Sequence, residues 1–152
     1  MNFELKTVED TEALGAKLWE ILPPKSLVFL NGDLGAGKTT LVRGVLRATG
    51  YTGAVKSPTF TIVEEYLIGE RKILHFDLYR LTDPEELEWI GIRDYMAQTS
   101  LCFIEWSELG RGFLPEPDLI LNLAINGHYR TVEMLANSKN AESFLTAILE
   151  KQ

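Results

Sequence analysis

Residues 32–39 read Gly-Asp-Leu-Gly-Ala-Gly-Lys-Thr, the Gly-x-x-x-x-Gly-Lys-Thr pattern of a phosphate-binding loop. An apolar run over residues 26–30 precedes the loop, and residues 40–49 have helical periodicity. A strand, a glycine-rich turn and a helix in this order direct backbone amides and the positive end of the helix dipole at a polyphosphate. The segment therefore predicts an α/β domain that binds a nucleotide.

Length and composition set the class of the whole chain. Its 152 residues fit one domain, 1–152, and 24% charged with 45% hydrophobic residues is ordinary for a soluble globule. No apolar run approaches the roughly 20 residues that cross a bilayer, and no basic segment leads into an apolar core at the start. We therefore expect a cytoplasmic protein with no membrane partner.

Charge and cysteine content argue against two further classes. The formal net charge is −7, and Lys and Arg supply most non-specific affinity for nucleic acid, so the chain is not expected to hold nucleic acid by itself. Cys102 is the single cysteine, which excludes an internal disulfide. It lies in the apolar run 101–104, so we expect a buried small hydrophobe.

Alternating and helical patterns predict a three-layer α/β phosphate-loop NTPase fold with a mixed, largely parallel sheet. Thr7 begins a helix that ends before Pro23, and Asp83 begins another, whose acids form a solvated face or an interface. A hairpin turn at Gly69 and Glu70 joins two strands. The expected strands are 3–5, 26–30, 62–68, 72–79, 101–105, 119–125 and 131–135, and a last helix starts near Ala141.

Two acids lie where the predicted strands end. Alternation places His75, Asp77 and Tyr79 on one face of the strand 72–79, and ligands of α/β sheets bind at the carboxyl edge. Asp77 is thus a candidate for holding Mg²⁺ or positioning water, or else a structural cap, while His75 is expected to be structural. Glu105 follows four apolar residues, as does the second acid of a phosphate-loop ATPase, although any buried strand can end in an acid.

Other candidate residues flank these. Lys38 is expected to be exposed and to reach the β and γ phosphates, and Thr39 to ligate Mg²⁺. Trp106 either packs on the site or, more commonly for an aromatic residue at a strand end, belongs to the core. The hydroxyls of residues 57–61 either sense a γ-phosphate or make a turn.

Four motifs together resemble the TsaE (YjeE) family of small bacterial ATPases. They are residues 32–40, Ser-Pro-Thr-Phe at 57–60, His-Phe-Asp-Leu-Tyr-Arg at 75–80 and Ile-Glu-Trp at 104–106, and the resemblance runs from about Thr7 to Arg130. It implies Mg²⁺-dependent ATP hydrolysis and a role in making threonylcarbamoyladenosine at position 37 of tRNAs that read ANN codons. It also implies TsaD and TsaB proteins as partners, with TsaD performing the transfer and tRNA reached through those partners.

The resemblance also assigns roles to residues. It implies that Thr39 and Glu105 are Mg²⁺ ligands, that Asp77 is important for hydrolysis, and that Thr11 and Arg130 lie near the nucleotide. Lys38, Asp77 and Glu105 form the expected catalytic set. The expected phosphate cradle is Gly35, Ala36, Gly37, Lys38, Thr39 and Thr40.

Three alternatives remain open at this point. A small-molecule kinase uses the same loop but needs an acceptor pocket and usually an arginine-bearing lid, for which no arginine cluster is evident. A GTPase is disfavoured, because no Asp is followed three positions later by Gly and no Asn-Lys-x-Asp occurs. A nucleotide-gated binding module without hydrolysis is the third.

Overall fold

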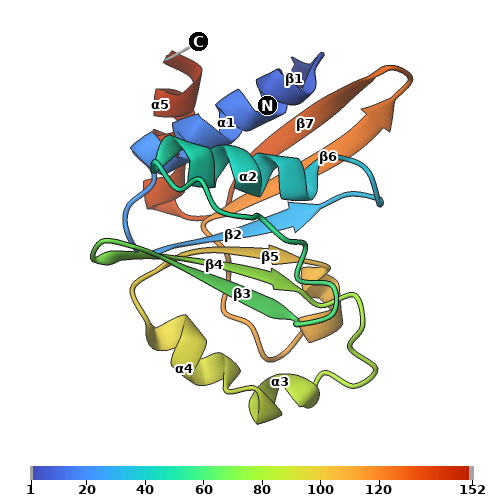
Figure 1. The fold of residues 1–152 in the computed structure, drawn as a ribbon, viewed down its shortest axis with the longest axis vertical. Coiled ribbons are helices and arrows are strands. Elements are labelled where there is room, and N and C mark those ends of the chain that lie inside the picture. The colour runs from blue at the N-terminus through green and yellow to red at the C-terminus, as the bar shows by residue number, and fades with distance from the viewer. Residues whose placement is uncertain (1, 151–152) are drawn as a thin grey trace.

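A seven-stranded mixed sheet organises residues 2–150, the part of the chain that this computed structural model describes (Figure 1). Its strand order is β1-β7-β6-β2-β5-β4-β3. The strands are β1 (Asn2–Leu5), β2 (Ser26–Asn31), β3 (Val63–Ile68), β4 (Arg71–Asp77), β5 (Leu101–Glu105), β6 (Leu119–Asn126) and β7 (Tyr129–Ala136). The helices are α1 (Val8–Ile21), α2 (Lys38–Ala48), α3 (Glu86–Trp89), α4 (Ile92–Ala97) and α5 (Lys139–Glu150), with a 3₁₀ turn, η1 (Ser107–Gly110).

The expected mixed sheet is confirmed, with its parallel part confined to the centre. Strands β6, β2, β5 and β4 run parallel, through the pairs β2–β6, β2–β5 and β4–β5. The pairs β1–β7, β6–β7 and β3–β4 are antiparallel. Short turns can join only antiparallel neighbours, so the hairpins β3–β4 and β6–β7 make the two flanks antiparallel.

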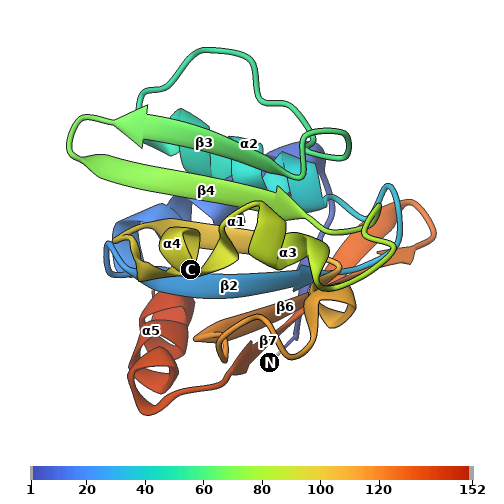
Figure 2. The same cartoon turned by 90° about the horizontal axis from the view of Figure 1, so that it is seen from below.

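Helices cover both faces of the sheet, as the three-layer prediction requires. Figures 1 and 2 show α1, α2 and α5 on one face and α3 and α4 on the other. Leu18 and Val45 pack with Phe103 on the first face, whereas Leu87 and Ile104 pack on the second. Every residue of β5 is buried, which explains its unbroken apolar run.

Most predicted boundaries hold to within about two residues, and the end of β4 and the start of α3 shift for a clear reason. Thr7 caps α1 in a capping box with Asp10, as expected. Strand β4 ends at Asp77 rather than at residue 79, because Asp77 Oδ1 accepts a hydrogen bond from the Tyr79 amide and turns the chain. Asp83 likewise accepts from the Glu85 amide and forms a turn, so α3 begins only at Glu86.

The structure also bears on the expectations for Cys102 and for membrane-spanning segments. Cys102 is buried, and this burial raises the pKa of its thiol, in agreement with a small hydrophobe. Within residues 2–150, none of the helices combines the length and the apolar character needed to cross a membrane.

Helices α1 and α2 cross in close contact at two glycines. A Cβ added at Gly44 would lie 2.2 Å from the Glu12 carbonyl oxygen, and one added at Gly15 would lie 2.3 Å from the Leu41 carbonyl oxygen. Both obstacles are backbone atoms, so a methyl group would have to separate the helices. The crossing sets the position of α2, which begins at the phosphate loop.

Replacing Gly44 with alanine is therefore expected to destabilise the protein by about 1–3 kcal/mol or more, as overpacking does. Helix propensity alone would make the change stabilising by about 1 kcal/mol. The sign of the change in the free energy of unfolding therefore separates overpacking from helix propensity. Urea unfolding measures it. Ala13→Gly, at an exposed position of α1, measures the effect of helix propensity alone. A Gly44→Ala protein more stable than wild type would contradict the close crossing of α1 and α2.

Candidate functional site

The phosphate loop connects β2 to α2 at the carboxyl edge of the parallel strands. Gly35 and Gly37 have φ of 83° and 106°, a left-handed conformation that glycine adopts without strain. A Cβ at Gly32 would lie 2.5 Å from the Leu123 carbonyl oxygen, so the backbone passes too close for a side chain. The first-turn amides of α2 have no partner within the helix, and Gly37 offers no side-chain cap. The loop thus presents unsatisfied donors, which suit an anion.

Lys38 is buried, which corrects the expectation of an exposed side chain. It is 5% exposed, and its Nζ donates a hydrogen bond to the Gly32 carbonyl oxygen. The same Nζ lies 3.5 Å from Glu105 Oε1 and 4.8 Å from the ring centroid of Trp106. Lys38 is the first residue of α2, so its side chain extends back along the loop toward the end of β5.

Glu105 and Asp77 are adjacent at this edge, as the sequence predicted. They are the last residues of β5 and β4 and are paired in the parallel register. Both are buried, at 4% and 5% exposure. A buried carboxylate needs donors, and each has them: Lys38 and His75 for Glu105, and Thr59 and the Tyr79 amide for Asp77.

His75 contacts the site, although the sequence predicts only a structural role for it and the expected catalytic set does not include it. Its Nε2 lies 2.5 Å from Glu105 Oε2, and the ring is completely buried. The alternation that placed His75 on the face of Asp77 was the available signal. It could not show which residue of a strand distant in sequence would lie opposite the ring.

The loop 57–61 is bound to Asp77. Thr59 Oγ1 donates to Asp77 Oδ2 at 3.1 Å, and the hydroxyls of Ser57 and Thr59 are 2.8 Å apart. Ile62, which ends the loop, has φ of 71°, a strained conformation for a β-branched residue, and its carbonyl accepts from the Asp77 amide. The hydroxyl loop and the acid therefore form one unit.

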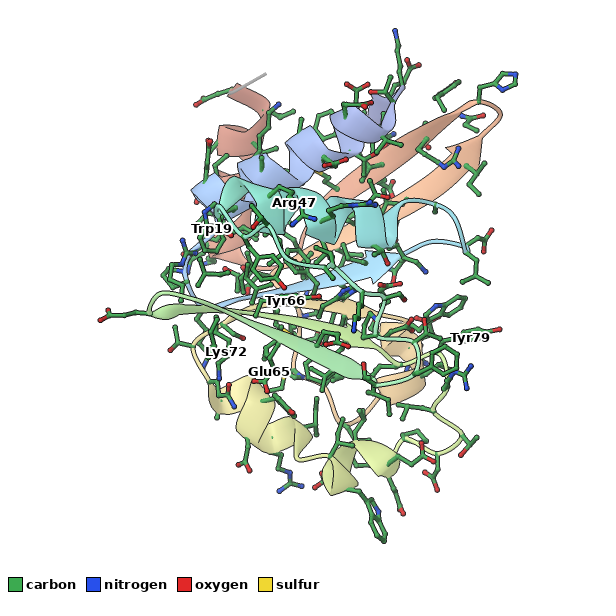
Figure 3. All side chains as sticks on the ribbon, viewed as in Figure 1. Trp19, Arg47, Glu65, Tyr66, Lys72 and Tyr79 are labelled. Carbon is green, nitrogen blue, oxygen red and sulfur yellow. The ribbon has the colours of Figure 1, made fainter. Side chains whose placement is uncertain are left out.

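Trp106 packs against the apolar cluster beneath α3 and α4 and also borders the site. It is half-buried, has φ of 58°, and lies 5.0 Å from Tyr79 between ring centroids. Figure 3 shows Tyr79 beyond the end of β4, at the edge where the parallel strands end. Trp106 therefore contacts both the site and the core, so both alternatives hold.

Two cavities adjoin the phosphate loop. One of about 260 Å³ brings together five predicted nucleotide contacts, Thr11, Gly35, Gly37, Thr40 and Arg130. Arg130 Nε also donates to the Gly35 carbonyl oxygen at 3.1 Å. The other, of about 620 Å³, is lined by Lys38, Trp106 and Arg111 among others. Of the remaining cradle residues, Ala36 is buried in the core and Thr39 lies in the first turn of α2.

The donors at this edge fit Mg²⁺ bound with a nucleotide. The Thr39 hydroxyl and the Glu105 carboxylate are hard oxygen ligands. Within the described part of the chain, no group of three or more His, Cys, Asp or Glu residues could form a metal cage. Mg²⁺ rarely uses such a cage, because it keeps waters and takes phosphate oxygens as ligands.

The three layers, the central parallel strands and the loop between β2 and α2 define a phosphate-loop α/β protein. The sequence profile described as threonylcarbamoyl adenosine biosynthesis protein TsaE matches residues 5–133. The chain belongs to the TsaE family.

Individual relatives agree with this assignment. A tRNA threonylcarbamoyladenosine biosynthesis protein TsaE of Haemophilus influenzae is 54% identical over 121 residues, which cover 80% of this chain and 77% of that protein. The one from Rickettsia conorii is 36% identical and covers 96% of this chain and 85% of its own length. The crystal structure of Bacillus subtilis YdiB superposes with a TM-score of 0.84 at 26% identity, covering 99% of this chain and 95% of that one.

Proposed function

We propose that this chain is a Mg²⁺-dependent ATPase that acts in tRNA threonylcarbamoyladenosine biosynthesis, together with TsaD and TsaB proteins. The observation that carries the proposal is the meeting of Lys38 and Glu105, 3.5 Å apart, beside the glycine-rich loop at the start of α2. Family membership supports the pathway. The net charge of −7 supports contact with tRNA through the partners.

In the proposed mechanism, the loop amides and Lys38 hold the phosphates and offset the charge that develops on the γ-phosphoryl group. Thr39 and Glu105 would hold Mg²⁺, which would supply further positive charge for phosphoryl transfer. Asp77 orients the attacking water through a remaining lone pair, because Oδ2 already accepts from Thr59 and Oδ1 from the Tyr79 amide. Thr11 and Arg130 line the cavity that takes the nucleoside end.

Phosphate release from ATP and from GTP, each with Mg²⁺ and with a chelator, tests this proposal. We expect Mg²⁺-dependent release from ATP. Binding of ATP without release in any mixture, partners included, would leave a nucleotide-gated binding module instead.

A small-molecule kinase is the second candidate, and one observation favours it. The 620 Å³ cavity adjoins Lys38 and carries Arg111, so it has room for an acceptor. A kinase would consume ATP without free phosphate when a metabolite extract is added. Release of one phosphate per ATP, unchanged by the extract, would exclude it.

The two acids are expected to respond differently to neutralisation. Glu105→Gln should raise the Mg²⁺ requirement by about 10–100-fold, because it removes the charge of a metal ligand. Asp77→Asn should keep Mg²⁺-ATP binding and lower turnover by about 10²–10⁴-fold, because orientation of the water acts in the rate. Calorimetry and phosphate release measure the two effects. The reverse pattern would mean that the roles are exchanged.

A further inference from the structure

We infer that His75 is a positioning residue for Glu105, which holds one carboxylate oxygen so that the other is presented at the phosphate loop. The inference rests on the proposed function, in which Glu105 binds Mg²⁺. Its basis is the arrangement of partners around the two oxygens of Glu105. His75 Nε2 lies 2.5 Å from Oε2, and Lys38 Nζ lies 3.5 Å from Oε1.

The two contacts fix the orientation of the carboxylate. The terminal torsion of a glutamate is broad and roughly two-fold, so an unrestrained carboxylate exchanges its oxygens. A carboxylate oxygen only accepts hydrogen bonds, and we therefore assign the hydrogen of this contact to His75 Nε2. With Oε2 held by the ring, Oε1 is the oxygen that faces Lys38.

Burial makes the contact effective. His75 is completely buried and Glu105 is 4% exposed, so water does not compete for either group. Ile73, on the same face of β4, belongs to the apolar cluster that packs under α1 and α2. An imidazole in such a place is costly unless its polar atoms are used.

The polar chemistry of His75 is directed at Glu105 alone. Its Nδ1 is buried and has no hydrogen-bond partner among the described residues. The ring therefore forms no second polar link that would give it a separate structural role. Partners that hold a metal-binding carboxylate commonly contribute about 10–100-fold to metal affinity.

The test uses the full chain, a non-hydrolysable ATP analogue and Mg²⁺, with binding measured by calorimetry. His75→Leu removes the donor and puts an apolar side chain in the buried position. His75→Gln restores an amide donor near the position of Nε2, whereas the amide of His75→Asn is one bond shorter. Ile73→Val is the matched control for disturbed packing, because Ile73 is on the same face of β4 and is paired with Leu101, four residues before Glu105.

We expect His75→Leu and His75→Asn to raise the Mg²⁺ concentration for half-maximal binding by about 10–100-fold, with His75→Gln close to wild type. Binding of the analogue in the presence of a chelator should stay unchanged in all of them, as should the Mg²⁺ requirement of Ile73→Val. Circular dichroism shows whether His75→Leu folds. If it does not, the Mg²⁺ requirements of His75→Gln and His75→Asn are compared with each other, and that comparison is the test.

A wild-type Mg²⁺ requirement in His75→Asn, or equal defects in Asn and Gln, would overturn the inference. Glu105→Gln separates that failure from failure of the proposed function. If Glu105→Gln raises the requirement and His75→Asn does not, only the positioning role is wrong. If Glu105→Gln also behaves as wild type, Glu105 is not a metal ligand and the proposed metal site fails with it.

Discussion

Lys38→Met is expected to lower ATP turnover by about 10²–10³-fold, the range lost when a preorganised electrostatic group is removed. In the proposed mechanism Lys38 is the charged side chain that acts on the phosphates, and Met keeps the length and packing of its stem. ATP affinity should fall as well, because the charge acts on the bound phosphates before reaction. Calorimetry and phosphate release measure the two effects.

Because Lys38 is buried, replacing it should also lower the stability of the fold. Its removal leaves the Gly32 carbonyl without this donor and takes the charge from beside Glu105 Oε1. A buried group that loses its partner costs about 1–3 kcal/mol, so the free energy of unfolding should fall by that order. Glu105 keeps its contact with His75, which limits the loss.

Lys72→Met is the matched control for this prediction. Lys72 also contacts a glutamate, Glu65, at 3.5 Å, and both lie near α4, away from the phosphate loop (Figure 3). Lys72→Met should leave ATP binding and turnover unchanged. Equal turnover in Lys38→Met and wild type would contradict the role of the loop lysine.

Addition of a TsaD–TsaB assembly is expected to raise ATP turnover by about 10³–10⁵-fold, if a partner supplies the arginine that stabilises the transition state. Arg111 lines the cavity beside Lys38, whereas Arg130 contacts the Gly35 carbonyl and Arg43 contacts the Thr40 hydroxyl. The cavity of about 620 Å³ that Lys38 lines is where we expect a partner side chain to enter. The lone chain should therefore turn over slowly.

Association with the partners should depend on ATP and on the loop 57–61. Thr59→Val removes the hydroxyl that donates to Asp77, and it should weaken the effect of ATP on association in sedimentation experiments. Thr61→Val is the control, because the Thr61 hydroxyl contacts Glu64 instead. Rapid turnover by the lone chain, with no change in rate or association when the partners are added, would overturn this prediction and favour the kinase.

The sequence by itself determined the features that depend on neighbouring residues. The phosphate loop, the helix start at Thr7 and the hairpin at Gly69 and Glu70 were predictable because each depends on turn geometry within a few positions. The apolar run of β5, its final acid and the position of Asp77 late in the preceding strand were predictable for the same reason. The shared edge of Asp77 and Glu105 followed from the rule that parallel strands end together.

Only the tertiary structure decided which of these residues touch. The contact of His75 with Glu105 depends on the register of two strands separated by about thirty residues, which no local pattern specifies. The burial of Lys38 and the bond from Thr59 to Asp77 depend likewise on how α2 and the loop 57–61 lie against the end of the sheet. Local sequence sets turns and periodicity, whereas contacts between distant segments are set by the packing of the whole core.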